Sequence, residues 1–154
     1  MNIKRYLAPL LVLLPMLAFG QTAAEMDGML EAETVSAAKA ARFVLGTVDL
    51  LPAGLSGPEA ERAAYDMAAS KGWIKALSGE ALTLKDTAFL VMNAFELKGG
   101  LMYSLVKSPR YAYREMVYRK LIQGQTDQAM KVSGPRFLTI LDKTSLYAGD
   151  GGSK

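Results

Sequence analysis

Residues 108–124 read SPRYAYREMVYRKLIQG. Ser108 is a favoured N-cap residue, and Pro109 follows at the first helical position, where the N–H that proline lacks would have no partner. The run then continues without a helix breaker to Gly124, a residue typical of turns. This stretch therefore predicts a helix that begins at Pro109 and ends near residue 121.

The same kind of helix-start signal recurs along the chain, at Ser36, Ser56, Thr83 and Ser133. Thr83 and Asp86 nearly form a capping box, in which Asp replaces the usual Glu. Apolar residues after each start repeat at helical spacing and are expected in the core. These patterns predict a mostly α-helical fold of about five short helices. The expected helices cover residues 35–46, 57–71, 84–97, 109–121 and 134–144.

The N-terminus has the pattern of a secretory signal peptide. Lys4 and Arg5 supply positive charge, an apolar run follows over Tyr6–Phe19, and small residues precede a cleavage site after Gly20. A second possible site follows Ala24. The apolar run is short for a membrane span, which favours cleavage over an uncleaved anchor, so no stable transmembrane segment is expected. We therefore expect an exported protein, in the periplasm or on the cell surface.

The composition excludes several kinds of chemistry. The chain has no cysteine and no histidine, so disulfides, thiolate metal sites and Ser-His or Cys-His catalytic pairs are absent. Asp66 and Glu115 lie at similar positions in two expected helices, but solvated helix faces explain them better than an acid–base pair. No catalytic residue, metal or cofactor is therefore expected, and the sequence favours a non-enzymatic protein.

Charge is divided between the two halves of the chain. Residues 25–97 carry a net charge of −5, and residues 98–136 carry a net charge of +6. The basic half could contact a polyanion. The two halves could also attract each other, or could present solvated faces without a partner.

An internal repeat is visible at an offset of 48 residues. It matches Tyr65 with Tyr113 and Leu84 with Val132. It predicts helix–loop–helix units that stack, because neither unit can bury its apolar face alone. The expected organisation is a signal peptide (1–20), a flexible lead (21–33), one helical domain (34–146) with two and a half repeats (34–50, 57–97, 108–146), and a flexible tail (147–154).

Residues 111–124 resemble the first half of an S-layer homology module: a helix with an early aromatic residue and Ala, then a hydrophobic-Ile-x-Gly exit. Residues 125–132 stand where that family has a polar loop, and residues 133–141 where it has Thr-Arg-Ala-Glu and an apolar helix. Residues 60–97 resemble a more degenerate copy. The chain is also similar to small exported envelope proteins of spirochaetes, a group of unassigned function.

The resemblance implies stacked S-layer homology-like units and an anionic cell-wall glycan as ligand. In that family the Arg of Thr-Arg-Ala-Glu holds the glycan, with help from a Trp. Neither copy here has this Arg, because the corresponding stretches read Leu84-Lys85-Asp86-Thr87 and Val132-Ser133-Gly134-Pro135. The fold can therefore be shared without the glycan site.

The candidate binding surface is basic and aromatic. Arginine offers paired hydrogen bonds to carboxylate or phosphate groups, and aromatic rings offer a flat face to a sugar. Packing at helix interfaces is the alternative for the aromatic residues. A signal peptide argues against nucleic acid as the partner. The expected partner is a cell-wall glycan such as peptidoglycan or, alternatively, an envelope protein of a periplasmic or surface assembly. The candidate ligand-binding residues are Trp73, Tyr103, Lys107, Arg110, Tyr111, Tyr113 and Arg114.

Overall fold

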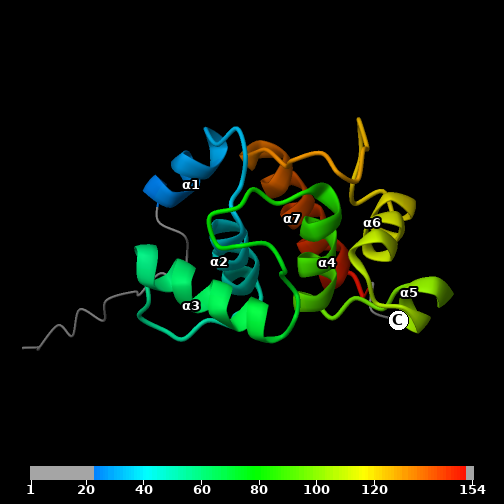
Figure 1. Cartoon of the computed structure of the whole chain (residues 1–154), viewed down its shortest axis with the longest axis horizontal. Coiled ribbons are helices and arrows are strands. Elements are labelled where there is room, and N and C mark those ends of the chain that lie inside the picture. The colour runs from blue at the N-terminus through cyan, green and yellow to red at the C-terminus, as the bar shows by residue number, and fades with distance from the viewer. Residues whose placement is uncertain (1–22, 152–154) are drawn as a thin grey trace, which may run out of the picture.

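The computed structural model describes residues 23–151, and the expected leader (residues 1–20) lies outside this part. The described part is mostly α-helical, as the sequence predicts, with seven helices in place of about five (Figure 1). Within it, no helix combines the length and the apolar character that a membrane crossing requires. The helices are α1 (Ala23–Leu30), α2 (Ala37–Thr47), α3 (Gly57–Ser70), α4 (Leu84–Ala94), α5 (Leu101–Leu105), α6 (Pro109–Tyr118) and α7 (Gly134–Gly149).

Side-chain caps start three of these helices. The Ser36 hydroxyl accepts a hydrogen bond from the Lys39 N–H at the start of α2. Thr83 and Asp86 form the predicted capping box of α4, each bonding to the backbone N–H of the other. Ser108 caps α6. Each cap provides a partner for a backbone N–H that the helix itself leaves unpaired. Helices α4 and α6 begin at the predicted residues, and α2 begins at Ala37, after its cap, rather than at residue 35.

The other two predicted caps work differently. Ser56 and Ser133 occupy the N-cap positions of α3 and α7, but neither side chain bonds to the backbone of its helix. Pro58 and Pro135 lie in the first turns instead. The fixed φ angle of proline suits the first turn of a helix. Proline also has no N–H, so it leaves no donor without a partner there.

The prediction of a flexible lead over residues 21–33 is wrong for residues 23–30, which form α1. Met29 is 1% exposed, and Glu25 lies 3.8 Å from the buried Arg42 of α2. Tertiary contacts therefore hold α1 in place. The sequence Thr22-Ala23-Ala24-Glu25 also has the spacing of a capping box, a start signal that the prediction of a flexible lead did not use.

The prediction of a flexible tail from residue 147 is also wrong at its start. Helix α7 continues to Gly149. The Tyr147 hydroxyl accepts a hydrogen bond from Arg119 Nη1 at 3.0 Å, and the guanidinium of Arg119 also lies over the Tyr147 ring. The contact with α6 explains why the helix is longer than its apolar spacing indicates.

A closed ring of three backbone hydrogen bonds lies at the centre of the fold. The Val35 N–H donates to Val132 O, the Val132 N–H donates to Leu82 O, and the Leu82 N–H donates to Val35 O, at 2.9–3.0 Å. All three residues are fully buried. Each directly precedes the N-cap of α2, α4 or α7. The ring therefore brings the starts of these three helices to one point.

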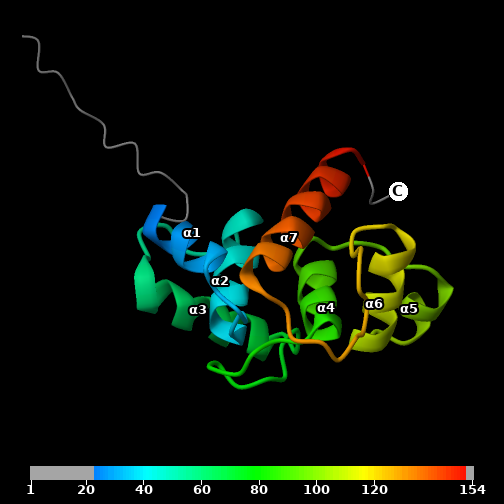
Figure 2. The ribbon, with the colours of Figure 1, turned by 90° about the horizontal axis from the view of Figure 1, so that it is seen from above.

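Helices α2, α4 and α7 form the centre, and each is covered by one outer helix. Helix α3 packs on α2, α6 packs on α4, and α1 packs on α7. In both views α1 and α3 lie at one end of the molecule and α5 and α6 at the other (Figures 1 and 2). Helices α1 and α6 each cover a central helix that is not adjacent to them in the chain, so these apolar faces are buried only in the complete arrangement.

The structure corrects the register of the sequence alignment. Val132 takes the same place in the ring as Leu82, whereas the alignment matches it with Leu84. The reason lies in the loops. Tyr65 donates its hydroxyl hydrogen to Ala76 O, 11 residues further on, and Tyr113 donates to Thr126 O, 13 residues further on. The second loop is longer by two residues, so an offset that fits the tyrosines no longer fits beyond them.

Candidate functional site

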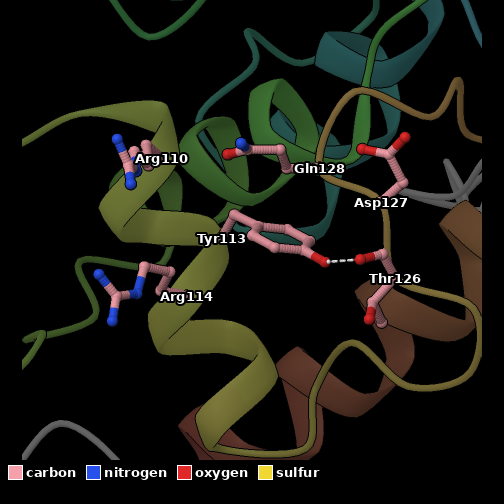
Figure 3. Close-up of a pocket in the computed structure, with 6 residues that line it drawn as sticks. All are labelled: Arg110, Tyr113, Arg114, Thr126, Asp127 and Gln128. Atoms are coloured by element: carbon pink, nitrogen blue, oxygen red, sulfur yellow. Dashed lines mark hydrogen bonds between the residues drawn. The ribbon is translucent and has the colours of Figure 1, made fainter.

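A surface pocket of about 300 Å³ lies between α6 and the loop that follows it (Figure 3). Helix α6 contributes three residues that the sequence predicts for ligand binding. The loop contributes three residues that were not predicted individually. The six lining residues are Arg110, Tyr113, Arg114, Thr126, Asp127 and Gln128.

Helix α6 places its three pocket residues on one face. Arg110, Tyr113 and Arg114 are spaced at i, i+3 and i+4, which brings them together on a helix surface. The opposite face carries Ala112 and Met116, both fully buried against the core. Because the buried face fixes the rotation of the helix, the two arginines must point outward.

Tyr113 connects the helix to the loop. Its hydroxyl donates a hydrogen bond of 2.6 Å to Thr126 O, and Figure 3 shows the ring reaching across from α6. The guanidinium groups of Arg110 and Arg114 extend from the same helix on the side away from the loop in this view, although both residues line the pocket. The tyrosine hydroxyl is thus occupied by the protein, while the ring remains part of the pocket surface.

The loop is held from its other side by α7. Arg136 donates to Gln123 O and Gln125 O, and its Nη1 contacts Met130 Sδ at 3.2 Å. Asp127 accepts a hydrogen bond from the Ala129 N–H at 2.9 Å. These bonds hold the loop at both ends, so the pocket is formed before any ligand arrives.

The pocket is electropositive. Arg110 and Arg114 are both exposed, and neither forms an ion pair within the described part of the chain. Asp127 is the single carboxylate among the lining residues. The balance of two guanidinium groups against one carboxylate favours an anionic ligand.

The corresponding face of α3 has three residues at the same spacing, but the charges of its two ionised side chains cancel. Arg62, Tyr65 and Asp66 are spaced there as Arg110, Tyr113 and Arg114 are in α6. Arg62 Nε lies 4.0 Å from Asp66 Oδ2, so this arginine is already paired. The two faces therefore differ chiefly in the residue that follows the tyrosine, which is an acid in α3 and an arginine in α6.

The remaining predicted site residues lie outside the pocket. Tyr103 in α5 is buried at 4% exposure, and Tyr111 is half-buried against the core. Trp73 packs against the core beyond α3, with Lys71 Nζ 5.2 Å from its ring centroid. Lys107 is exposed but does not line the pocket. The predicted surface is therefore divided, and three of its seven residues meet at the pocket.

The two carboxylates considered for acid–base chemistry are separately engaged. Asp66 is exposed and pairs with Arg62. Glu115 bonds to Arg119 at 2.7 Å and accepts a hydrogen bond from the Gly100 N–H at 3.0 Å. Residues 23–151 contain no group of three or more acidic side chains that could hold a metal ion.

Burial raises the pKa of the Tyr103 phenol above its ordinary value of 10.0, although a hydrogen bond with the Asn93 side chain acts in the opposite direction. Above about pH 10 the unfolded chain ionises while the folded protein keeps this phenol neutral, so the free energy of unfolding falls as pH rises.

We expect the free energy of unfolding of Tyr103→Phe to fall less steeply with pH than that of the unaltered protein, when urea unfolding is measured at a series of pH values across pH 10. Tyr118→Phe is the control, because Tyr118 is 84% exposed. If the free energy of unfolding of Tyr103→Phe falls with pH as steeply as that of the unaltered protein, the raised pKa of Tyr103 is contradicted.

No protein-family model, curated protein or solved structure matches this chain. Its function is therefore inferred from the chemistry of the pocket.

Proposed function

We propose that this protein is an exported, non-enzymatic module of the cell envelope, whose α6 pocket binds an anionic cell-wall glycan such as peptidoglycan. The observation that carries the proposal is the pair of exposed arginines beside Tyr113 at a preformed pocket. The N-terminal signal-peptide pattern supports a location where such a glycan is present.

The lining residues suit a ligand that carries both carboxylates and sugar rings. The guanidinium groups of Arg110 and Arg114 can each form two hydrogen bonds to a carboxylate, such as those of the stem peptides of peptidoglycan. The Tyr113 ring offers an apolar face to a sugar, and the bond of its hydroxyl to the loop holds the ring in place. Asp127 and Gln128 add acceptors, and Gln128 also adds a donor, for sugar hydroxyl groups.

The proposed site differs from that of S-layer homology modules. In that family the Arg is the second residue of Thr-Arg-Ala-Glu. Lys85 and Ser133 stand at that position in the two corresponding stretches of this chain. Neither side chain carries a guanidinium group, so the arginines of α6 replace it in this proposal.

The test is co-sedimentation with purified cell-wall sacculi. The chain beginning at Gln21 retains every helix of the structure and is expected to be retained at low salt and released at high salt. Arg110→Ala combined with Arg114→Ala is expected to weaken binding at least tenfold, because each hydrogen bond to a charged group contributes about 1.5–3 kcal/mol. Arg114→Asp is expected to do the same, since it reproduces the paired arrangement of α3.

The matched control is Arg62→Ala. Arg62 lies at the position of α3 that corresponds to Arg110, and its side chain is exposed, so its loss should leave retention unchanged. Equal retention of the double variant and the unaltered chain would show that the pocket is not the binding site.

The second candidate function is that of a protein-interaction subunit in a periplasmic or surface assembly, without a glycan ligand. The absence of the family's glycan-binding arginine from both copies, at Lys85 and at Ser133, favours it. The same experiment separates the two candidates. Failure of the unaltered chain to sediment with sacculi at low salt would overturn the glycan proposal in favour of this one.

A further inference from the structure

Helix α5 carries apolar side chains on its inner face, toward the core, and also on its outer face, toward solvent. Tyr103 points inward and is 4% exposed. Four apolar residues lie outward and are between 52% and 75% exposed: Leu101, Met102, Leu105 and Val106. Their i, i+4 spacing places them in one contiguous patch, here called the α5 patch.

Such a patch is unusual on a surface helix. A helix at the surface normally turns polar residues toward water, and grouped exposed apolar residues mark contact with a partner or a membrane. Leu77 provides a contrast within the same molecule. It is 74% exposed, but it stands alone in the loop after α3, as single apolar residues on protein surfaces commonly do.

The α5 patch is held in a fixed position. The Gly100 N–H donates to Glu115 of α6 at 3.0 Å, and Arg119 donates to Lys98 O. The Tyr103 ring packs so closely on Gly99 that an added Cβ there would lie 2.3 Å from its Cδ1 atom. These contacts anchor both the start of α5 and its inner face. The outer face is therefore already ordered, and binding to it loses no conformational entropy of the helix.

The surroundings of the patch are basic. Lys98 precedes α5 and Lys107 follows it, and both are exposed. Residues 97–114 contain no Asp or Glu. The two carboxylates that flank this range are Glu96, which is exposed, and Glu115, which is paired with Arg119 at 2.7 Å. Neither Lys98 nor Lys107 forms an ion pair within residues 23–151. An apolar patch between two such cations is complementary to a surface that is negative at its boundary and apolar beneath it.

We propose that the α5 patch docks onto an anionic lipid surface. Leu101 and Leu105, the two most exposed apolar residues of α5, enter the boundary between head groups and acyl chains. Lys98 and Lys107 contact the phosphate groups. Peripheral proteins use this combination, because apolar insertion and electrostatic attraction add to each other.

Lipid docking is independent of glycan binding. The α5 patch and its two lysines share no residue with the α6 pocket. Both sites nevertheless lie at the same end of the molecule, since α5 packs on α6 (Figure 2). A protein with both sites would join a membrane surface to a wall polymer.

The test is co-sedimentation of the chain beginning at Gln21 with lipid vesicles. We expect the chain to bind mixed vesicles of phosphatidylcholine and phosphatidylglycerol. Binding to vesicles of phosphatidylcholine alone is expected to be at least tenfold weaker. Leu101→Ser combined with Leu105→Ser should weaken binding to mixed vesicles about tenfold or more. Lys98→Ser combined with Lys107→Ser should also weaken it and reduce its salt dependence.

Two controls show whether a loss of vesicle binding is specific to the α5 patch. Leu77→Ser removes a leucine of similar exposure from the loop after α3 and should leave vesicle binding unchanged. Arg114→Asp should weaken binding to sacculi much more than binding to vesicles. Circular dichroism checks that each variant remains helical.

Three results would overturn the proposal: no binding to mixed vesicles, equal binding to both kinds of vesicle, or unchanged binding of the Leu101 and Leu105 double variant. A chain that fails to bind vesicles but self-associates through these two leucines, as judged by sedimentation velocity, would assign the patch to a second copy instead.

Discussion

Replacing Phe137 with alanine is expected to lower the free energy of unfolding by about 3–5 kcal/mol, the range typical of a fully buried phenylalanine. Phe137 is completely buried in α7 and meets Phe43 of α2 edge to face, with ring centroids 6.4 Å apart and an angle of 85° between the rings. The substitution would leave a cavity between two of the three central helices. It would also remove an aromatic contact that adds about 0.5–1.5 kcal/mol.

Urea unfolding followed by circular dichroism measures this effect. Tyr118→Ala is the control, because Tyr118 is 84% exposed and its loss should change the free energy of unfolding by no more than about 0.5 kcal/mol. A loss below about 1 kcal/mol in Phe137→Ala would contradict the packing of α7 on α2.

Gly134→Ala is expected to destabilise the protein by about 3 kcal/mol, near the upper end of the usual range for overpacking. A Cβ atom at residue 134 would lie 1.6 Å from the backbone oxygen of Met29 at the end of α1. The Gly134 N–H also donates to Ala32 O at 2.8 Å. Since backbone cannot yield as a side chain does, α1 must move away from α7, and the buried Met29 side chain must be partly exposed.

Urea unfolding reports the total loss, and amide hydrogen exchange in α1 reports its location. Gly149→Ala, at the other end of α7, is the matched control. No atom lies within 4 Å of its added Cβ, so the change should be neutral or stabilising by up to about 1 kcal/mol. Equal stability of Gly134→Ala and the unaltered protein would show that α1 does not pack here.

The four helices α3, α4, α6 and α7 could be placed from the sequence because their starts are encoded locally. A cap residue or an early proline precedes each apolar run, and the structure begins each helix at the predicted residue. Helix α1 has a Thr-x-x-Glu start pattern at Thr22 but is short and contains Gly28, and α5 has only five residues after two glycines. Both are held by contacts with distant residues, which periodicity does not detect.

The central ring could not be predicted for a related reason. Val35, Leu82 and Val132 resemble any other buried apolar residue in the sequence, and their pairing depends on which strand-like segments meet in space. The longer loop after α6 also displaced the alignment by two residues. An offset of 48 residues makes Phe137 correspond to Phe89, whereas the ring register, with an offset of 50, makes it correspond to the buried Thr87.

For the candidate site, the sequence identified the charges but not their partners. Arg110, Tyr113 and Arg114 share a helix face, and spacing alone shows this. Trp73 and Tyr103 pack inward instead. An aromatic side chain suits a core as well as a ligand site, and only burial separates the two cases.

The loop half of the pocket, residues 126–128, could not be predicted because hydrogen bonds from Tyr113 and Arg136 position it. The available signal in the sequence is the match between Tyr113 and Tyr65 of α3, since each tyrosine bonds to the loop that follows its helix.

The most direct test of glycan binding at the α6 pocket is an NMR titration of the isotope-labelled chain beginning at Gln21 with soluble fragments of cell-wall sacculi. The predicted result is that amide shift changes concentrate at residues 110–114 and 126–128, and that the corresponding residues of α3, 62–66, stay unchanged. Arg114→Asp should remove the changes. Shift changes confined to other parts of the molecule, or no changes at ligand concentrations that saturate sacculus binding, would contradict it.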